Sequence, residues 1–200
     1  MNIAVFCSGN GSNLQAIIDA VKAGHIPARI ALVISDQRDA YALARATRAG
    51  IETLWLDPKN FKTREDFDRE VMGHLAKHDV SLVVLAGFMR LLSPLLAKAY
   101  AGRIMNIHPA LLPSFKGTHG VRDALAYGVK VTGVTVHFVD DKLDNGPIIS
   151  QRAVEIRPDD TGESLFERIH AVEHKLYPEA VKLFAEGRLE IVGRTVKIRS

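Results

Sequence analysis

Asn106 and His108 stand two residues apart, where a short apolar run passes into a loop that contains Pro109. Side chains at positions i and i+2 of an extended segment point to the same side, so we expect the amide and the imidazole to face one space. An amide that donates to a developing oxyanion and an imidazole that carries a proton suit a reaction through a tetrahedral carbon. Taken alone, His108 fits a structural role equally well.

A carboxylate and a second histidine follow further along the chain. Asp144 lies in the polar turn at residues 143–147, between two extended runs, and His137 lies on the first of these runs. A carboxylate beside an imidazole stabilises the charged form of the ring and orients it. The spacing alone favours Asp144 as a turn former, because Asp-Asn-Gly is common turn chemistry, and His137 can face either side of its run.

The segment Ser-Gly-Asn-Gly-Ser-Asn at residues 8–13 separates the first apolar run from a helical pattern. Glycines let the backbone approach an anion closely, and the free N–H groups of a helix N-terminus attract it. A dinucleotide site needs a third glycine where Leu14 stands, so the loop favours a monophosphate site. The alternatives are a plain tight turn and a nicotinamide enzyme that uses Asp36, at the end of the second strand, to bind a ribose.

The histidines also allow metal-binding interpretations, which the sequence supports less well than the catalytic one. His74 and His78 have i, i+4 spacing, but no glutamate follows His74, so we expect an exposed helix face and no zinc-protease motif. A facial triad of His108, His119 and Asp144 is a further alternative. The pattern as a whole predicts no metal site.

Strands and helices alternate along the first half of the chain. Apolar runs predict strands at residues 3–7, 29–35, 51–56 and 82–86. Strands that are apolar on both faces and separated by helices predict an α/β fold, with a mostly parallel twisted sheet covered by helices on both faces, Rossmann-like in this half. One of these helices should cover 40–49, and Thr63 should cap the next. Such sheets bind ligands beyond the carboxyl ends of their strands, so the loops that follow strands should carry the site.

The second half has a mixed character. We expect a brief strand at residues 103–106, followed by a long loop at 107–120. Two extended runs at 131–139 and 148–156, a long helix at 162–187 and a hairpin at 189–198 should follow. Asp160 and Glu163 are placed as a capping box for the helix, and Pro178 should kink or divide it. With no linker and no repeat, we expect a single domain over 1–200. Its phosphate-binding half should cover about 1–100, and its catalytic half, about 101–200, should extend the same sheet in mixed orientation.

The composition is that of an ordinary globular protein, with 200 residues, 47% of them hydrophobic and 24% charged. The net charge is only +3, and Lys and Arg are interspersed with Asp and Glu, unlike a nucleic-acid-binding surface. No apolar stretch approaches the ~20 residues of a membrane span, and no cationic leader precedes the first strand. We therefore expect a cytoplasmic protein that binds neither nucleic acid nor a membrane. The single cysteine, Cys7, lies in an apolar strand and predicts an inert thiol.

Five separated segments resemble the phosphoribosylglycinamide formyltransferases, folate-dependent enzymes of purine biosynthesis. The segments read FCSGNGSNLQAI, TREDFDRE, VVLAGFMRLLSP, MNIHPALLPSFKGTHG and GVTVHFVDDKLDNGPIISQ, and the similarity covers nearly the whole chain. HPALLPSFKG and LDNGPII are formyltransferase signatures, and SGNGSN separates the purine enzymes from other folate-using relatives. The resemblance implies the formyltransferase fold and transfer of a formyl group from 10-formyltetrahydrofolate to the amino group of glycinamide ribonucleotide. It also implies a monomer or homodimer without a metal.

The resemblance also implies roles for individual residues. Asn106 would hold the formyl oxygen as it becomes an oxyanion, and His108 would stabilise that intermediate and move protons. Asp144 would favour the protonated form of His108, with His137 as a supporting group. The phosphate and ribose of the substrate would be bound by Gly11, Ser12, Asn13 and Glu173. The folate pocket would be lined by Arg64, Met89, Arg90, Leu91, Leu92 and Asn106.

Related activities are the main alternatives. Methionyl-tRNA formyltransferase and formyltetrahydrofolate hydrolase share the catalytic segments, but they are expected to carry a C-terminal tRNA-binding domain and an N-terminal regulatory domain, neither of which we expect here. A nucleotide-binding oxidoreductase or a non-catalytic nucleotide sensor fits the first half alone, and neither requires Asn106, His108 and Asp144. His170, near the expected ribose site, stands at a position that varies in the family.

Overall fold

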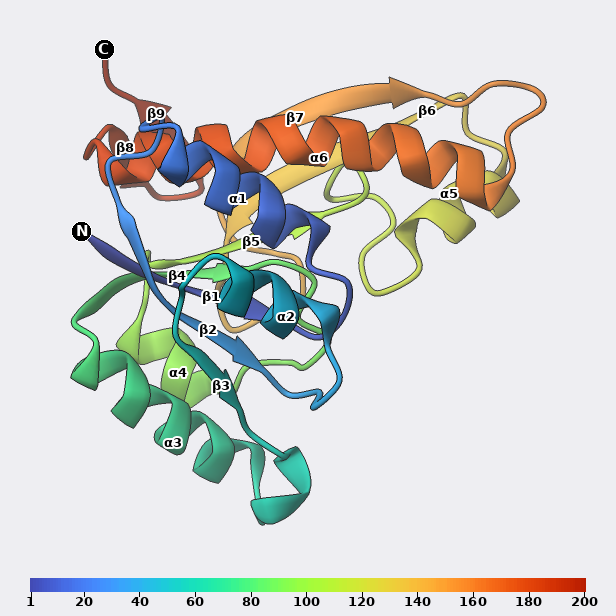
Figure 1. Cartoon of the computed structure of the whole chain (residues 1–200). Coiled ribbons are helices and arrows are strands. Elements are labelled where there is room, and N and C mark those ends of the chain that lie inside the picture. The colour runs from blue at the N-terminus through green and yellow to red at the C-terminus, as the bar shows by residue number, and fades with distance from the viewer.

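One continuous sheet runs through the whole protein. The computed structural model describes residues 1–200. The strands are β1 (Asn2–Cys7), β2 (Arg29–Ser35), β3 (Thr53–Trp55), β4 (Val80–Leu85), β5 (Ile104–His108), β6 (Val131–Phe138), β7 (Ile148–Glu155), β8 (Leu189–Val192) and β9 (Thr195–Ile198). Their order across the sheet is β3-β2-β1-β4-β5-β6-β7-β9-β8 (Figure 1). The strands from β3 to β5 are mutually parallel, whereas β5–β6, β6–β7 and β8–β9 are antiparallel, which confirms the predicted mixed sheet.

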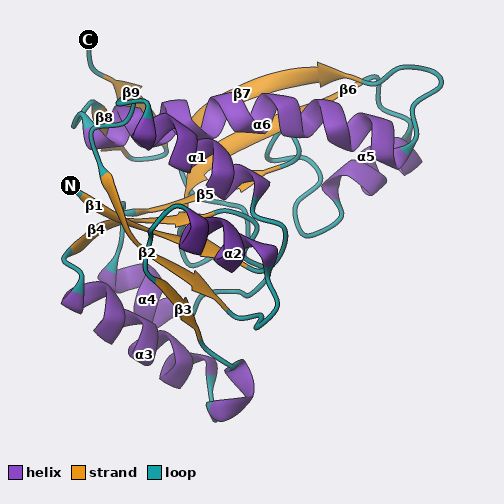
Figure 2. Ribbon diagram, in the orientation of Figure 1, coloured by secondary structure: helices purple, strands orange, loops and turns teal.

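Helices cover both faces of this sheet, as the sequence predicts. They are α1 (Ser12–Lys22), α2 (Tyr41–Arg48), α3 (Arg64–Lys77), α4 (Pro94–Ala99), α5 (Gly120–Tyr127) and α6 (Gly162–Ala185), with a 3-10 turn, η1, at Pro58–Asn60. The helices α1, α2, α5 and α6 pack on one face, and α3 and α4 on the other (Figure 2). None of them has both the length and the apolar character that a membrane crossing requires.

Alternate residues of the central strands face the two hydrophobic cores, which lie on opposite faces of the sheet. On β1, Ile3, Val5 and Cys7 face the core under α1 and α6, whereas Ala4 and Phe6 face the core under α3. Cys7 is fully buried, and burial raises the pKa of its thiol to about 12. The thiol therefore stays protonated, in agreement with the inert role predicted for it.

Several element boundaries differ from the sequence-based predictions. β5 extends to His108, so that Asn106 and His108 both lie within the strand, because β6 pairs with it up to that residue. The helices α4 and α5 were not predicted, since both are too short to show a clear apolar period. α6 is not divided at Pro178, because buried residues on both sides of that proline pack against the rest of the protein.

The predicted capping box at Asp160 and Glu163 is wrong. Thr161 caps α6 instead: its hydroxyl accepts from the Ser164 N–H, while the Ser164 hydroxyl accepts from the Thr161 N–H. Asp160 instead forms an ion pair with Arg168, which lowers the pKa of its carboxyl, and accepts from the Ser164 hydroxyl at 2.8 Å. The cap is therefore shifted by one residue from the predicted position.

The sheet has a topological switch point between β1 and β4. After β1 the chain moves to β2 on one side, and it later returns to place β4 on the other side. The loops after these two strands are joined there, because the Ser8 N–H donates to the Gly87 carbonyl at 3.0 Å and the Ser8 hydroxyl accepts from the Met89 N–H at 2.8 Å. Ligands of open α/β sheets bind at such a point.

The buried Tyr177 hydroxyl ties α6 to the strands that end at this edge. It lies 2.9 Å from the Leu85 carbonyl oxygen on β4 and 3.0 Å from the Met105 carbonyl oxygen on β5. We expect Tyr177→Phe to lower the free energy of unfolding by about 1–2 kcal/mol, because buried acceptors lose their donor. Urea denaturation measures this change. Tyr127→Phe, at a position that is 80% exposed, is the control, and an equal loss in both variants would contradict the account.

Candidate active site

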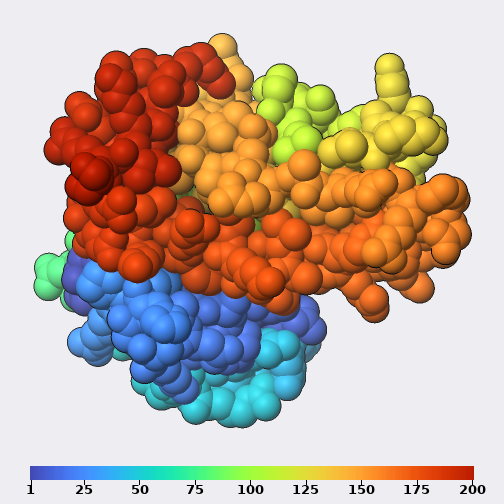
Figure 3. Space-filling view, turned by 90° about the horizontal axis from the view of Figure 1, so that it is seen from above, coloured from blue at the N-terminus to red at the C-terminus, as the bar shows by residue number.

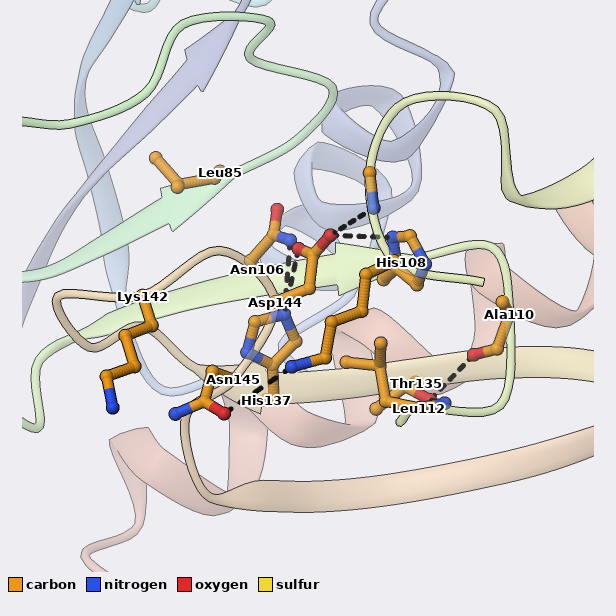
Figure 4. Close-up of polar contacts among 12 residues, drawn as sticks. Leu85, Asn106, His108, Ala110, Leu112, Thr135, His137, Lys142, Asp144 and Asn145 are labelled. Atoms are coloured by element: carbon orange, nitrogen blue, oxygen red, sulfur yellow. Dashed lines mark hydrogen bonds and ion pairs between the residues drawn. The ribbon is translucent and has the colours of Figure 1, made fainter. Parts of the chain in front are cut away.

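Three polar side chains meet at the carboxyl end of β5. Asn106 and His108 come from β5, and Asp144 comes from the loop between β6 and β7 (Figure 4). The Asp144 Oδ2 atom lies 3.6 Å from Nδ1 of His108, and the two side chains are only 8% and 4% exposed. A carboxylate that the sequence alone presents as a turn residue is thus a buried partner of the imidazole.

A backbone carbonyl fixes the tautomer of His108. The Nε2 atom of His108 lies 2.8 Å from the carbonyl oxygen of Phe115. Because a carbonyl oxygen only accepts, Nε2 carries the proton, and Nδ1 is left facing Asp144. Phe115 has a φ of 52°, a left-handed conformation that is strained for an aromatic residue. The loop thus holds this carbonyl against His108 at a conformational cost, and a second proton on the ring would be shared with the carboxylate.

His137 has the opposite tautomer. Its Nδ1 atom lies 2.8 Å from the carbonyl oxygen of Phe138, and its Nε2 atom lies 3.2 Å from Nδ2 of Asn106. Nδ1 therefore carries the proton, and Nε2 accepts from the amide. Burial lowers the pKa of His137, so the ring stays neutral although Asp144 is only 3.8 Å away. The antiparallel pairing places Asn106 directly opposite His137, and opposed residues share a face.

The loop that carries Asp144 has little conformational freedom. Asp144 itself has a φ of 45°, and its Oδ2 atom accepts a hydrogen bond from the Gly117 N–H at 2.8 Å. The side chain of Asn145 donates to Asp140 Oδ2 at 2.8 Å. A Cβ atom at Gly146 would lie 1.9 Å from the Phe138 carbonyl oxygen, so only glycine fits there. These constraints aim the carboxylate at the histidines.

A cavity of about 350 Å³ opens beside this group. All six residues predicted to line a folate pocket lie in its wall, namely Arg64, Met89, Arg90, Leu91, Leu92 and Asn106. Met89 and Leu91 are 65% and 57% exposed, although large apolar side chains are normally covered. An apolar slot with a few directed polar groups is typical of a small-molecule site.

The loop after β4, which forms one wall of the cavity, is anchored on α3. The buried carboxylate of Asp68 accepts from the Ser93 N–H, and Arg90 lies over the Phe67 ring with its guanidinium carbon 4.9 Å from the centroid. Burial raises the pKa of Asp68, against the opposing effect of the Ser93 hydrogen bonds and of Arg64 and Arg90. α3 therefore positions both arginines of the cavity.

The glycine loop forms a second polar region next to the cavity. Gly11 stands before α1 with a φ of 75°, and Ser12 and Asn13 are the first two residues of the helix. The N–H groups of Gly11, Ser12 and Asn13 have no acceptor within the protein. A Cβ atom at Gly11 would lie 2.7 Å from Ala42 Cβ, so a larger residue would push α2 away from the loop. Free N–H groups at a helix N-terminus suit an anion.

Glu173 and Asn13 meet at this helix N-terminus. Asn13 Nδ2 donates to Glu173 Oε2 at 2.9 Å, whereas the buried Oδ1 atom of Asn13 has no partner. Glu173 is 4% exposed, and burial raises the pKa of its carboxyl to about 7. A buried acceptor without a protein donor, here Asn13 Oδ1, suits a ligand that brings a hydroxyl group. The structure thus brings together all four residues that the sequence assigns to the substrate phosphate and ribose.

A row of aromatic side chains on α6 is not among the features predicted from the sequence. Phe166 lines the cavity, and the ring centroid of His170 lies 4.1 Å from that of Phe166 and 5.7 Å from that of His174. Burial lowers the pKa of both histidines. The i, i+4, i+8 spacing of the three residues, on the helix that carries Glu173, is a signal that predicts this row. Figure 3 shows α6 lying beside α1, so the row connects the cavity to the glycine loop.

The metal alternatives find no support in the geometry. No group of three or more His, Cys, Asp or Glu side chains is arranged to hold a metal ion. His119 is exposed, and its Nδ1 atom lies 3.1 Å from the Thr118 hydroxyl, so it does not join His108 and Asp144 in a triad. His74 and His78 each pair with a glutamate, Glu70 and Glu52.

Comparisons with known proteins identify the family. The family described as "Formyl transferase" matches residues 1–181. The chain belongs to the formyl transferase family. It is 47% identical to the phosphoribosylglycinamide formyltransferase of Escherichia coli (strain K12) over 191 residues, which cover 96% of this chain and 90% of the relative. It is 44% identical to the trifunctional purine biosynthetic protein adenosine-3 of Homo sapiens, over 98% of this chain and 19% of that protein.

A solved structure has nearly the same fold. The glycinamide ribonucleotide transformylase 1 of Symbiobacterium toebii superposes with a TM-score of 0.98 at 52% identity, over 100% of this chain and 94% of that chain. At this level of identity the likeness extends beyond the fold to the family. The protein is therefore an enzyme, a formyltransferase, with its polar centre and its cavity at the switch point of the sheet.

The raised pKa of Glu173 makes stability depend on pH. The pKa is about 7 in the folded protein and 4.5 for an unperturbed glutamate. Between these values the folded state binds more protons than the unfolded chain, so the free energy of unfolding falls as pH rises. We expect the free energy of unfolding of wild type to fall relative to that of Glu173→Gln, by on the order of 3 kcal/mol from about pH 4.5 to about pH 7.

Urea denaturation at a series of pH values measures this difference. Glu179→Gln, at an exposed position of the same helix, is the matched control and should leave the pH dependence of wild type unchanged. A difference between the free energies of unfolding of wild type and Glu173→Gln that stays constant, or that changes in favour of wild type toward neutral pH, would contradict the account of Glu173.

Proposed function

We propose that this formyltransferase transfers the formyl group of 10-formyltetrahydrofolate to the amino group of glycinamide ribonucleotide. The products are formylglycinamide ribonucleotide and tetrahydrofolate, and the reaction belongs to purine biosynthesis. The observation that carries the proposal is the convergence of Asn106, His108 and Asp144 beside a cavity, in a protein that also has a helix N-terminus with free N–H groups. One chain thus offers a place for a flat apolar donor, a reacting centre and a place for a phosphate.

The reaction at this centre is an acyl transfer. The substrate amine attacks the formyl carbon, a C–N bond forms, and the carbonyl electron pair moves to the oxygen. Asn106 donates one N–H to His137 Nε2, which leaves its second N–H to bind the oxyanion. The tetrahedral intermediate then expels N10 of the folate, the C–N10 bond breaks, and N10 takes a proton.

His108 handles the protons of this transfer. Its Nδ1 atom faces Asp144, whose negative charge stabilises the imidazolium that forms when the attacking amine gives up a proton. The same Nδ1–H then stabilises the oxyanion or protonates the leaving N10. His137 does not compete for this proton, because burial and the Phe138 carbonyl keep it neutral.

The two substrates fit the two ends of the site. We assign the pterin of the folate to the apolar side chains of Met89, Leu91 and Leu92, and the carboxylate-bearing end of the folate to Arg64 and Arg90. The phosphate of the second substrate is assigned to the N–H groups of Gly11, Ser12 and Asn13. Its ribose hydroxyls are assigned to Glu173 and to the unpaired Oδ1 of Asn13.

The proposal also covers the cellular location, the oligomeric state and the domain organisation of the enzyme. We propose a cytoplasmic monomer or homodimer that binds no nucleic acid and folds as a single domain over residues 1–200. A single sheet with one hydrophobic core on each face supports the single domain. Sedimentation of the purified protein decides between monomer and dimer.

An assay with purified protein tests the function. The protein is supplied with 10-formyltetrahydrofolate and glycinamide ribonucleotide, and the change in folate absorbance is followed. We expect turnover that depends on both substrates. Turnover with water or with charged methionyl-tRNA in place of glycinamide ribonucleotide, and none with the ribonucleotide, would overturn the proposal.

Asn106→Ala should reduce kcat by about a hundredfold or more, since the loss of one oxyanion donor costs on the order of 3 kcal/mol. Steady-state kinetics on both substrates measure the change. Asn60→Ala, in the 3-10 turn η1 away from the cavity, is the control and should behave as wild type. A kcat close to wild type in Asn106→Ala would show that the amide does not bind the oxyanion.

Asp144→Asn should reduce kcat by about a hundredfold, since proton transfer by a positioned side chain contributes about 10²–10⁴-fold to a rate. The variant keeps the size of the side chain but removes the charge that stabilises the imidazolium. Steady-state kinetics on both substrates measure the change. Asp159→Asn, at an exposed position outside the cavity, is the control and should behave as wild type. A kcat close to wild type in Asp144→Asn would contradict the coupling.

A further inference from the structure

Arg45 connects α2 to the glycine loop. Its Nε atom donates to the Asn10 carbonyl oxygen at 2.9 Å, and its Nη2 atom donates to Asn10 Oδ1 at 3.0 Å. Its Nη1 atom donates to Gln15 Oε1, on α1, at 3.3 Å. The guanidinium carbon lies 4.8 Å from the centroid of the Tyr41 ring. The planar fork is therefore held in one orientation, with two of its three hydrogen bonds on a single residue of the loop.

The hydrogen bonds to α2 determine where the loop directs its N–H groups. The Gly9 carbonyl accepts from the Ala42 N–H at 3.1 Å, and the Asn10 carbonyl accepts from Arg45. Both carbonyls therefore point toward α2. In a planar trans peptide the N–H of the following residue points the opposite way. The N–H groups of Asn10 and Gly11 are thus directed away from α2, and that of Gly11 has no acceptor within the protein.

We propose that Arg45 is a positioning residue for the phosphate of the substrate. By binding both oxygens of Asn10, it holds the Gly11 N–H, together with those of Ser12 and Asn13, in the arrangement that receives the anion. The proposal rests on the proposed function, which assigns the phosphate to this loop. Arg45 touches neither Asn106 nor His108, so it acts on substrate binding and not on the chemical step.

Besides orienting the glycine loop, Arg45 has a second effect, which is the electrostatic attraction of its positive charge for the phosphate. Its positive charge lies close enough to His174 to contribute to the lowered pKa of that histidine, and the same charge attracts a phosphate at longer range. Lysine keeps the charge but cannot form the fork that binds both oxygens of Asn10. The pair Arg45→Met and Arg45→Lys therefore distinguishes orientation of the loop from simple attraction.

Arg48 supplies a matched control. It lies one turn further along α2, its guanidinium carbon is 5.0 Å from the centroid of the same Tyr41 ring, and its Nε atom donates to the Ala44 carbonyl oxygen within its own helix. Arg48→Met removes the same charge and the same kind of stacking without touching the loop. Asn10→Ala is a second probe, since it removes the Oδ1 acceptor and keeps the carbonyl.

The experiment measures kcat and KM for each substrate, and the dissociation constant for inorganic phosphate by titration calorimetry. Arg45→Met and Arg45→Lys should raise KM for glycinamide ribonucleotide and the phosphate constant by about tenfold, the effect of losing charge-assisted hydrogen bonds. kcat and KM for the folate should stay within about twofold of wild type. Asn10→Ala should give a smaller rise, and Arg48→Met none.

An unchanged KM in Arg45→Met, full recovery in Arg45→Lys, or an equal rise in Arg48→Met would overturn the positioning role. Failure of the wild-type protein to formylate glycinamide ribonucleotide would overturn the proposed function instead. In that case the phosphate titration still decides the role of Arg45, because weaker phosphate binding in both Arg45 variants, with Arg48→Met like wild type, supports it without any turnover. Urea denaturation of each variant verifies that the fold is intact.

Discussion

The negative charge of Asp144, buried between two histidines, is the interaction on which the catalytic centre depends. A buried carboxylate is costly unless hydrogen bonds and a positive partner compensate for it. Here the Gly117 N–H supplies one hydrogen bond, and His108 is the ring whose free nitrogen faces the charge. Two backbone carbonyls, from Phe115 and Phe138, assign opposite tautomers to the two histidines. One ring is thereby set to gain a proton, and the other is set to orient the amide of Asn106.

The change from parallel to antiparallel strands makes this centre possible. β4 and β5 run parallel and end at the same edge as β1, where the glycine loop lies. β6 runs antiparallel to β5 and places His137 opposite Asn106. The loop between β6 and β7 then brings Asp144 to the carboxyl end of β5. α6 then crosses beside α1 and delivers Glu173 to the glycine loop. A phosphate site and a proton-transfer site are therefore held on one rigid sheet.

The sequence predicts the parts of this arrangement that depend on local periodicity. The shared side of Asn106 and His108 follows from a two-residue spacing, and the monophosphate loop follows from Leu14 in place of a third glycine. The role of Asp144 does not follow, because its partner lies 36 positions earlier and turn chemistry explains the residue equally well; only the resemblance to formyltransferases indicated it. The tautomers depend on main-chain carbonyls and leave no trace in side-chain identity. Arg45 likewise reads as one more surface arginine until the fold places it against Asn10.

The most direct test of this account is the protonation of the two histidines in the resting enzyme, followed by nitrogen-15 NMR of labelled imidazoles from about pH 5 to 8. The account predicts that neutral His108 carries its proton on Nε2 and gains the second on Nδ1. It predicts that His137 carries its proton on Nδ1 and has a bare Nε2 at neutral pH. Protonation of His137 at Nε2 before His108 is charged, or the same tautomer in both rings, would contradict it.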